Sequence, residues 1–244
     1  MITVCILTKN NASTLAKTLE STRLFPEVLI LDNGSTDNTL DIAVSFPNTV
    51  IHKTPFIGFG PLRNQAALLA KHDWILAIDS DEVLSNPNEI LNLKLDSEFA
   101  YAFPRHNFFN GKKIRGCGWG GEQVARLYHK KKSSYSPSFV HESLLAKKLA
   151  PLSSPLLHTP YRTTSEFLTK MQHYSSLFAE QNRYKKSSSH TKAVFHALFA
   201  FLRSYLMKRG FLDGFEGLFI SVYNANTAFY KYIKLLEANR EKRN

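Results

Sequence analysis

The sequence predicts an α/β protein that has a mostly parallel sheet in its first half and a helical C-terminal segment. In the first hundred residues, short apolar runs typical of buried strands alternate with segments of helical periodicity. Strands separated by single helices favour a parallel sheet with right-handed crossovers and helices on both faces. After about residue 160, long helical patterns replace the strand-like runs.

Turn and capping residues bound the elements of the first half. Asn11 or Ser13 can cap a helix, and Pro61 suits the first turn of another. These signals indicate a Rossmann-like half. The expected strands are residues 3–7, 28–32, 49–53 and 74–79, and the expected helices are residues 13–21, 36–46 and 61–72.

Beyond residue 100 the pattern changes twice. First come β-rich pieces punctuated by Gly and aromatic residues, which predict an antiparallel extension of the sheet; they include residues 124–129 and 139–145. Helices then follow, and Thr163 and Glu166 have the spacing of a capping box. We place a first domain at residues 1–160 and a helical segment at residues 161–244. The expected helices are residues 163–184, 190–208 and 212–244.

Composition places the chain among ordinary globular proteins. It has 244 residues, 43 % of them hydrophobic, and no apolar run approaches the roughly 18 residues of a membrane span. Residues 1–7 read as a strand and not as a signal peptide, so we expect a cytoplasmic protein. Cys5 and Cys117 are too few for a disulfide framework and are expected to be reduced thiols.

The net charge of +11 is unevenly distributed. Counting Lys and Arg against Asp and Glu, residues 1–100 carry −5, residues 101–181 carry +8 and residues 182–244 carry +8. A basic surface attracts phosphates on nucleic acid or anionic lipid, as well as acidic saccharides. Charge alone does not choose among these partners.

Acidic residues stand at the ends of two predicted strands. Asp32 ends one strand, Asp79 ends another, and Asp81 and Glu82 follow closely. In an open α/β sheet the ligand crevice lies outside the carboxyl ends of the strands. These carboxylates therefore predict a nucleotide-handling enzyme, although helix capping and turn formation would also use Asp.

Four motifs in order resemble a family 2 glycosyltransferase of the GT-A fold: Thr8-Lys9-Asn10-Asn11, Leu19-Glu20-Ser21, LDNGSTDNT at residues 31–39, and IDSDE at residues 78–82. The chain also resembles the branch that adds sugars to the lipopolysaccharide core. That likeness is carried by residues 58–64, 126–128, 140–142, 157–161 and 210–214. Asn33 and Glu122 depart from the pattern of many relatives, which often have Asp there.

The resemblance implies that the strand ends hold a UDP-sugar. Asp32 would accept from the uracil ring N–H, and Asp79 from ribose hydroxyls. Thr8 and Lys9 would reach the nucleotide, and Arg63 would bind a phosphate.

A divalent metal is also implied. Asp81 is the expected ligand of Mg²⁺ or Mn²⁺, which takes one or two carboxylates together with phosphate oxygens. His158 is a candidate for a further ligand, although a structural histidine is the commoner case.

Transfer also needs a base to deprotonate the acceptor hydroxyl. The resemblance points to Glu142, assisted or oriented by His141, with Glu122 as the second candidate. Trp119 and Arg126 are candidate contacts to the sugar or acceptor; the alternative for Trp119 is a packing role.

Residues 193–209 are apolar and aromatic, with cations at their end. Such a helix either docks on the catalytic domain or lies in a membrane interface, and we expect the second.

Together these features predict an inverting glycosyltransferase that moves a hexose from a UDP-sugar to a lipopolysaccharide core or other glycolipid. It would lie peripherally on the inner face of the cytoplasmic membrane and would not bind nucleic acid. The alternative is a catalytically inactive, basic membrane- or polyanion-binding module on a GT-A scaffold. A dehydrogenase is disfavoured because no Gly-x-Gly-x-x-Gly turn follows the first strand.

Overall fold

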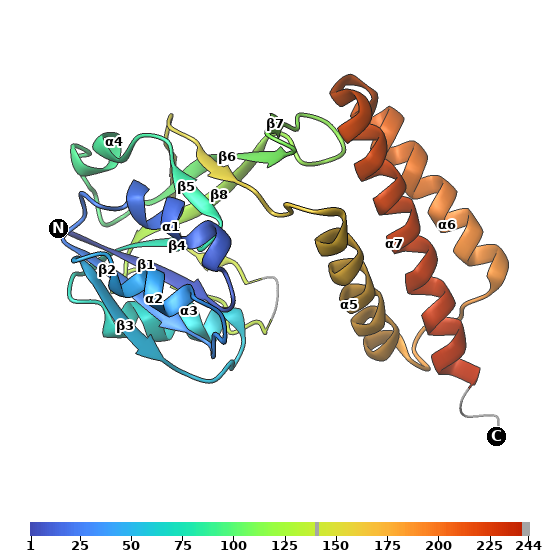
Figure 1. Cartoon of the computed structure of the whole chain (residues 1–244), viewed down its shortest axis with the longest axis horizontal. Helices are drawn as coiled ribbons and strands as arrows, with labels where there is room; N and C mark the ends of the chain where they lie inside the picture. The colour runs from blue at the N-terminus through green and yellow to red at the C-terminus, as the bar shows by residue number, and fades with distance from the viewer. Residues whose placement is uncertain (140–141, 241–244) are drawn as a thin grey trace. The chain divides into compact units, whose positions relative to one another are not determined.

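The structure, a computed structural model, describes residues 1–139 and 142–240. The predicted role of His141 therefore lies outside the described residues. The chain forms two compact units (Figure 1). The first comprises Met1–His106 and Glu122–His158, and the second comprises Asn107–Gly121 and Thr159–Asn244. The second unit thus takes in a segment from the middle of the chain.

A mixed sheet forms the centre of the first unit, in the strand order β3-β2-β1-β4-β8-β6-β12-β5. The first four strands are parallel, and β8 runs antiparallel to both β4 and β6. The α/β class with an antiparallel extension is therefore confirmed. The strands are β1 Ile2–Thr8, β2 Glu27–Asp32, β3 Thr49–Lys53, β4 Trp74–Asp79, β5 Glu82–Leu84, β6 Ala100–Phe109, β8 Glu122–His129, β11 Leu149–Pro151 and β12 Leu156–His158.

Helices cover both faces of the parallel part because successive strand residues point to opposite sides. Val4 and Ile6 of β1 pack in the same apolar cluster as Leu15 of α1. Cys5, in contrast, packs in the same cluster as Leu62 of α3. Strands buried on both faces explain why these segments are continuously apolar. The helices are α1 Ala12–Ser21, α2 Thr39–Val44, α3 Phe59–Leu69 and α4 Pro87–Leu91.

Residues 140–141 of the strand predicted at 139–145 lie outside the described residues. Of the described part, Leu144–Leu145 (β10) pairs with Ser134–Tyr135 (β9) in a separate two-stranded sheet. The carbonyl of Phe139, together with that of the preceding Ser138, accepts hydrogen bonds from the first N–H groups of α3. The backbone at Phe139 therefore caps a helix.

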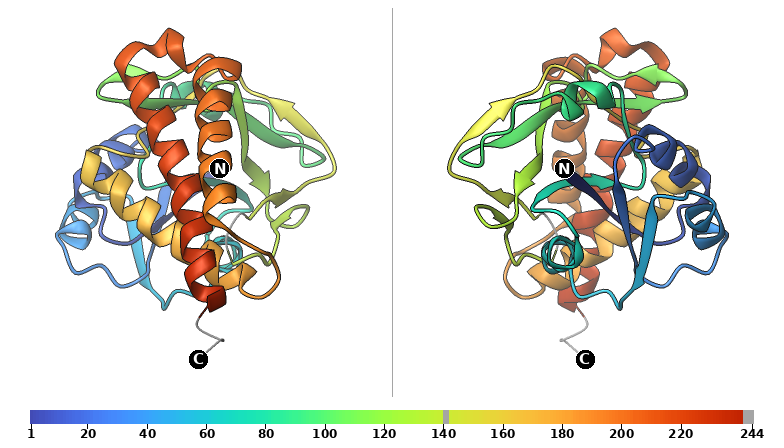
Figure 2. Two further views of the ribbon diagram at one scale, coloured as in Figure 1. Left: turned by 90° about the vertical axis from the view of Figure 1, so that its right-hand side faces the viewer. Right: turned by 90° about the vertical axis from the view of Figure 1, so that its left-hand side faces the viewer.

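Three helices dominate the second unit, and α7 lies beside both α5 and α6 (Figures 1 and 2). The predicted helix at 190–208 is α-helical only to Leu202 and then continues as a π-helical turn. Thr163 caps α5 by accepting from the backbone N–H of Glu166, as its spacing predicts. The elements are α5 Thr164–Asn182, α6 His190–Leu202, η1 Arg203–Met207, η2 Gly210–Asp213 and α7 Gly214–Arg240.

Residues 107–121 complete the core of this unit. The end of β6 forms a short hairpin with β7 (Lys112–Lys113), and Phe109 packs on Phe167 and Phe219. The Asp213 carboxylate accepts from the backbone N–H groups of Arg115 and Gly116. Over the described part of the chain, the helices are too short or too polar to cross a bilayer.

Candidate active site

The carboxyl ends of β2, β1 and β4 lie side by side. Thr8 is aligned with Asp32, and Leu7 is aligned with Asp79. Because β1 lies between β2 and β4, the backbones of Asp32 and Asp79 stand on either side of it, two strand spacings or about 10 Å apart. The structure thus brings Thr8, Asp32 and Asp79 to one edge of the sheet.

Side-chain hydrogen bonds tie together the loops that follow these strands. The Asn10 amide oxygen accepts from the backbone N–H of Thr36 at 2.7 Å. The Asn11 amide donates to the Ser80 hydroxyl at 2.8 Å, and Thr18 donates to the Ser80 carbonyl at 3.1 Å. The loops after β1, β2 and β4 are consequently held as one surface.

Asp32 closes the turn that follows its own strand. Its carboxylate accepts from the backbone N–H groups of Gly34 and Ser35 and from the Ser35 hydroxyl. Gly34 has a φ of +90°, a conformation that favours glycine. Only 1 % of Asp32 is exposed. In this structure the residue fixes the loop geometry, and its contact with uracil stays a prediction.

Asp79 lies between two guanidinium groups. One carboxylate oxygen accepts from Arg63 Nη2 and the other from Arg126 Nη2, each at 2.5 Å. Arg63 also donates through Nε to Glu142 Oε1 at 2.8 Å. Burial would raise the pKa of Asp79, but the cations of Arg126 and Arg63 outweigh it and hold that pKa well below its usual range.

The same network continues through Glu82, whose side chain is fully buried. Glu82 Oε1 accepts from Arg126 at 2.8 Å and from Arg105 at 3.2 Å, and Oε2 accepts from the Asp79 N–H at 3.0 Å. Arg105 makes a two-pronged contact with Glu122, with its closest distance 2.7 Å. Glu142 and Glu122, the two candidate bases, therefore stand at opposite ends of one chain of ion pairs.

Sequence reasoning did not find Arg105, and it gave Glu82 no specific role. Arg105 belongs to no recognisable motif and reaches the site through the pairing of β6 with β8, which aligns it with Glu122. Glu82 follows the acidic motif and gave a usable signal, but its burial depends on Arg126, 44 residues away.

Several buried polar atoms at the site have no hydrogen-bond partner among the described residues: Thr8 Oγ1, Arg63 Nη1 and Arg126 Nε. Leaving a buried donor unpaired costs about 1–3 kcal/mol. Unpaired donors beside a cluster of carboxylates are typical of a site that holds a polar ligand.

Asp81 and His158 are neighbours, because β12 pairs with β5 and aligns His158 with Glu82. His158 Nε2 lies 3.5 Å from Asp81 Oδ2, and the Asp81 side chain is 25 % exposed. Among the described residues no group of three His, Cys, Asp or Glu side chains could enclose a metal ion. One carboxylate and one imidazole nevertheless fit an ion that takes its other ligands from phosphate and water.

Lys9 and Trp119 make none of the ion pairs of this network among the described residues. Lys9 is exposed at the end of β1. Trp119 belongs to the second unit, where its ring stacks on Tyr161 at 5.8 Å and on Phe167 at 6.3 Å between centroids. This packing supplies the structural role that was the alternative for Trp119, and its contact with a sugar stays a prediction.

Residues 3–93 match the family model described as glycosyl transferase family 2, as the motifs predict. A Rickettsia felis protein named as an uncharacterized glycosyltransferase is 29 % identical over 269 residues, which cover 100 % of this chain and 92 % of that protein. The lipopolysaccharide core biosynthesis glycosyltransferase LpsC of Rhizobium meliloti is 26 % identical over 95 % of this chain and 90 % of its own length.

Among solved structures, Staphylococcus aureus TarS in complex with UDP-GlcNAc is similar at 13 % identity with a TM-score of 0.49, over 99 % of this chain and 91 % of that one. Glucosyl-3-phosphoglycerate synthase from Mycobacterium tuberculosis, in complex with Mn²⁺, UDP and phosphoglyceric acid, has 21 % identity and a TM-score of 0.35. That likeness covers 46 % of this chain and 44 % of the other.

Replacing Arg126 with Met should destabilise the first unit by about 3–5 kcal/mol, because Glu82 would lose its main cation while remaining buried. Urea denaturation measures the loss. The double variant Arg126→Met with Glu82→Gln should recover part of it, since the buried charge is then removed. Arg23→Met is the control, because Arg23 pairs with Glu20 in an exposed contact. A loss below about 1 kcal/mol for Arg126→Met would show that Glu82 does not depend on it.

Proposed function

We propose that the protein transfers a hexose from a UDP-sugar to a lipopolysaccharide core or other glycolipid, with inversion, because residues 3–93 match the family model of glycosyl transferase family 2. The observation that carries this proposal is the convergence of Thr8, Asp32, Asp79 and Asp81 around the carboxyl ends of three neighbouring strands. A similar protein, LpsC, is named for lipopolysaccharide core biosynthesis.

In the proposed complex, the nucleotide lies across the ends of β2 and β1. Asp32 accepts from the uracil N–H at the edge of its turn, and Thr8 and Lys9 contact the nucleotide from β1. Asp79 accepts from ribose hydroxyls, with Arg63 and Arg126 fixing its orientation. Arg63 Nη1, which has no partner among the described residues, is available for a phosphate.

Asp81, with His158 beside it, would hold Mg²⁺ or Mn²⁺. Such an ion supplies charge stabilisation to the departing diphosphate. The contribution of the chain itself is to place a carboxylate and an imidazole next to the proposed phosphate position and to keep Asp81 partly open to solvent.

Glu142 is the proposed base. Its pairing with Arg63 orients the carboxylate, so that its second oxygen can take the proton of the acceptor hydroxyl. Glu122 is the second candidate, at the other end of the ion-pair chain. His141 is proposed to assist Glu142, and Arg126 and Trp119 to contact the sugar or acceptor.

The helical segment is proposed to hold the protein on the inner face of the cytoplasmic membrane, where a glycolipid acceptor is presented. Large apolar side chains of α6 and η1 are exposed, including Val194, Phe195, Leu198, Leu202 and Met207. Residues 181–212 contain seven Lys or Arg and no Asp or Glu. An apolar face with a cationic surround suits anionic headgroups, whereas pairing with a second copy would oppose like charges.

The second candidate function is a catalytically inactive basic module that binds membranes or polyanions. The basic second half favours it. The two candidates differ in their response to nucleotide, because an inactive module has no need of a donor.

UDP with Mn²⁺ should stabilise the protein against heat, by about 2.7 kcal/mol at a hundred times the dissociation constant. Asp81→Asn should lose the Mn²⁺-dependent part of that stabilisation. Differential scanning fluorimetry and calorimetry measure it, and Asp41→Asn, at an exposed position of α2, is the matched control. Equal stabilisation by any polyanion, independent of Asp81, would favour the inactive module.

A donor screen that measures UDP release should find one UDP-sugar that is hydrolysed slowly alone and faster with a crude lipid extract. Glu142→Gln should lower the lipid-dependent rate by at least about a hundredfold, since general base catalysis contributes about 10²–10⁴. UDP binding should change little in this variant. Full activity in Glu142→Gln, together with loss of activity in Glu122→Gln, would identify Glu122 as the base.

Substituting Phe195, Leu198 and Leu202 by Ser should reduce partition into anionic liposomes at least about tenfold. Moving each exposed apolar side chain from water into the interface lowers the free energy of the bound state, and Ser loses that contribution. Sedimentation with vesicles measures the partition. Ser substitutions at Leu24, Val44 and Leu68, exposed residues of the first unit, form the control. Undiminished liposome binding by the Phe195, Leu198 and Leu202 variant would show that this face of α6 does not contact the membrane.

A further inference from the structure

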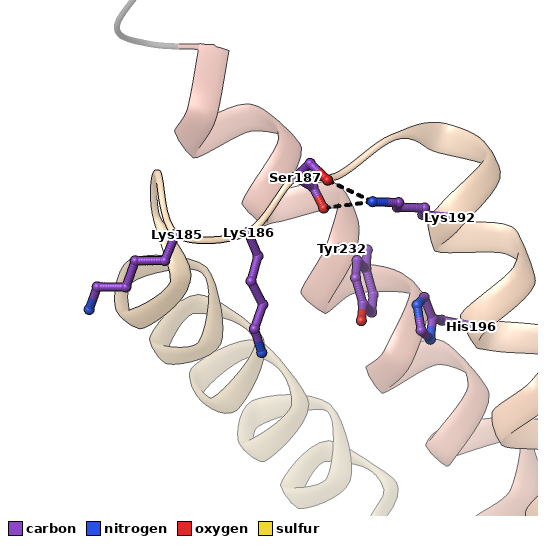
Figure 3. Close-up of a pocket in the computed structure, with 6 residues that line it drawn as sticks. All are labelled: Lys185, Lys186, Ser187, Lys192, His196 and Tyr232. Carbon is purple, nitrogen blue, oxygen red and sulfur yellow. Dashed lines mark hydrogen bonds between the residues drawn. The ribbon is translucent and has the colours of Figure 1, made fainter.

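The second unit contains a basic cavity that the proposed transfer reaction does not use. It has a volume of about 360 Å³ and lies where the connection from α5 to α6 meets α7 (Figure 3). It is lined by Lys185, Lys186, Ser187, Lys192, His196 and Tyr232. Three of these six residues are lysines and none is acidic.

The lysines come from two separate places. Lys185 and Lys186 belong to the connection, and Lys192 lies in the first turn of α6. Lys192 Nζ donates to the Ser187 hydroxyl at 2.6 Å, which holds its ammonium group near the rim of the cavity. In Figure 3 the Lys185 side chain points away from Lys186 and Lys192. Three cations around this cavity without a carboxylate still create a positive potential that favours a multiply charged anion.

A second cavity of about 350 Å³ adjoins the first. The two share His196 and Tyr232, whose rings stack with centroids 4.0 Å apart and an interplanar angle of 5°. The second cavity is lined largely by apolar groups between α5, α6 and α7, among them Phe178, Phe199, Ala200 and Ala228. Arg203 and Lys231 add two further cations to its lining.

We propose that these two cavities form one binding site for a single anionic amphiphile. Its phosphate group lies among Lys185, Lys186 and Lys192, and its hydrocarbon chain runs along Phe178 and Phe199. A small free anion would leave the apolar cavity unfilled, and a neutral lipid would leave the lysines without a counter-charge. The site does not depend on glycosyl transfer.

The test uses isothermal titration calorimetry with the full chain, without nucleotide, at physiological ionic strength. A short-chain phosphatidic acid, below its critical micelle concentration, should bind with a stoichiometry of one. Inorganic phosphate and a short-chain phosphatidylcholine should each bind at least about tenfold more weakly, since each satisfies only part of the site. Absence of saturable phosphatidic acid binding would overturn the proposal, as would equal binding of either partial probe.

Two variants locate the site. The triple change Lys185→Gln, Lys186→Gln and Lys192→Gln should weaken phosphatidic acid binding at least about tenfold. The matched control Lys17→Gln, Lys94→Gln and Lys147→Gln removes the same charge from exposed positions of the first unit and should change it less than about twofold. An equal loss of phosphatidic acid affinity in the two triple variants would mean that only the net charge matters, and it would contradict the proposed site.

Ala228→Leu should narrow the apolar cavity and weaken phosphatidic acid binding without affecting inorganic phosphate. Circular dichroism checks that each variant is folded. Unchanged phosphatidic acid affinity in Ala228→Leu would show that the hydrocarbon chain of the ligand does not lie in the apolar cavity. Because no donor is present in these titrations, their outcome is separate from that of the glycosyltransferase assays.

Discussion

The arrangement of the first unit depends on the need to pair charges buried at the end of β4. Glu82 exposes none of its side chain, so Arg126 and Arg105 must both reach it. Arg126 lies on β8 and Arg105 on β6, which means that one buried carboxylate links the parallel strands to the antiparallel extension. A buried carboxylate without its cations would be costly enough to disfavour any other pairing of these strands.

The same pairing orders the proposed catalytic groups. Asp79 cannot rotate freely, because both its oxygens are held by guanidinium groups. Arg63, held by Asp79, in turn orients the Glu142 carboxylate. Arg105, held by Glu82, orients the Glu122 carboxylate in the same way. Preorganised charges of this kind need little rearrangement when a charged substrate arrives, which is the condition for strong electrostatic stabilisation.

The parallel half could be predicted closely from the sequence, whereas the antiparallel half could be predicted only in part: the expected strand at 124–129 lies within β8. Residues 49–53 and 74–79 form strands with the predicted bounds. For residues 74–79 the local signal is a continuous apolar run that follows a helix. Within the described part of the strand expected at 139–145, the Phe139 carbonyl instead accepts from an N–H of α3, a contact about 80 residues away in sequence. Likewise, the acidic motifs identify Asp81 and Glu82, but only long-range strand pairing brings His158 to Asp81 and Arg105 to Glu82.

The middle segment 107–121 has a practical consequence. Phe109, Ile114 and Cys117 lie in the same apolar cluster as Phe167 and Ile220 of the C-terminal helices. A truncation after β12 would therefore not release an intact catalytic module: it would strip the partners from an apolar hairpin and expose it to water. Gene fragments intended to separate the two units must excise this hairpin as well, or replace it with a short polar turn between β6 and β8.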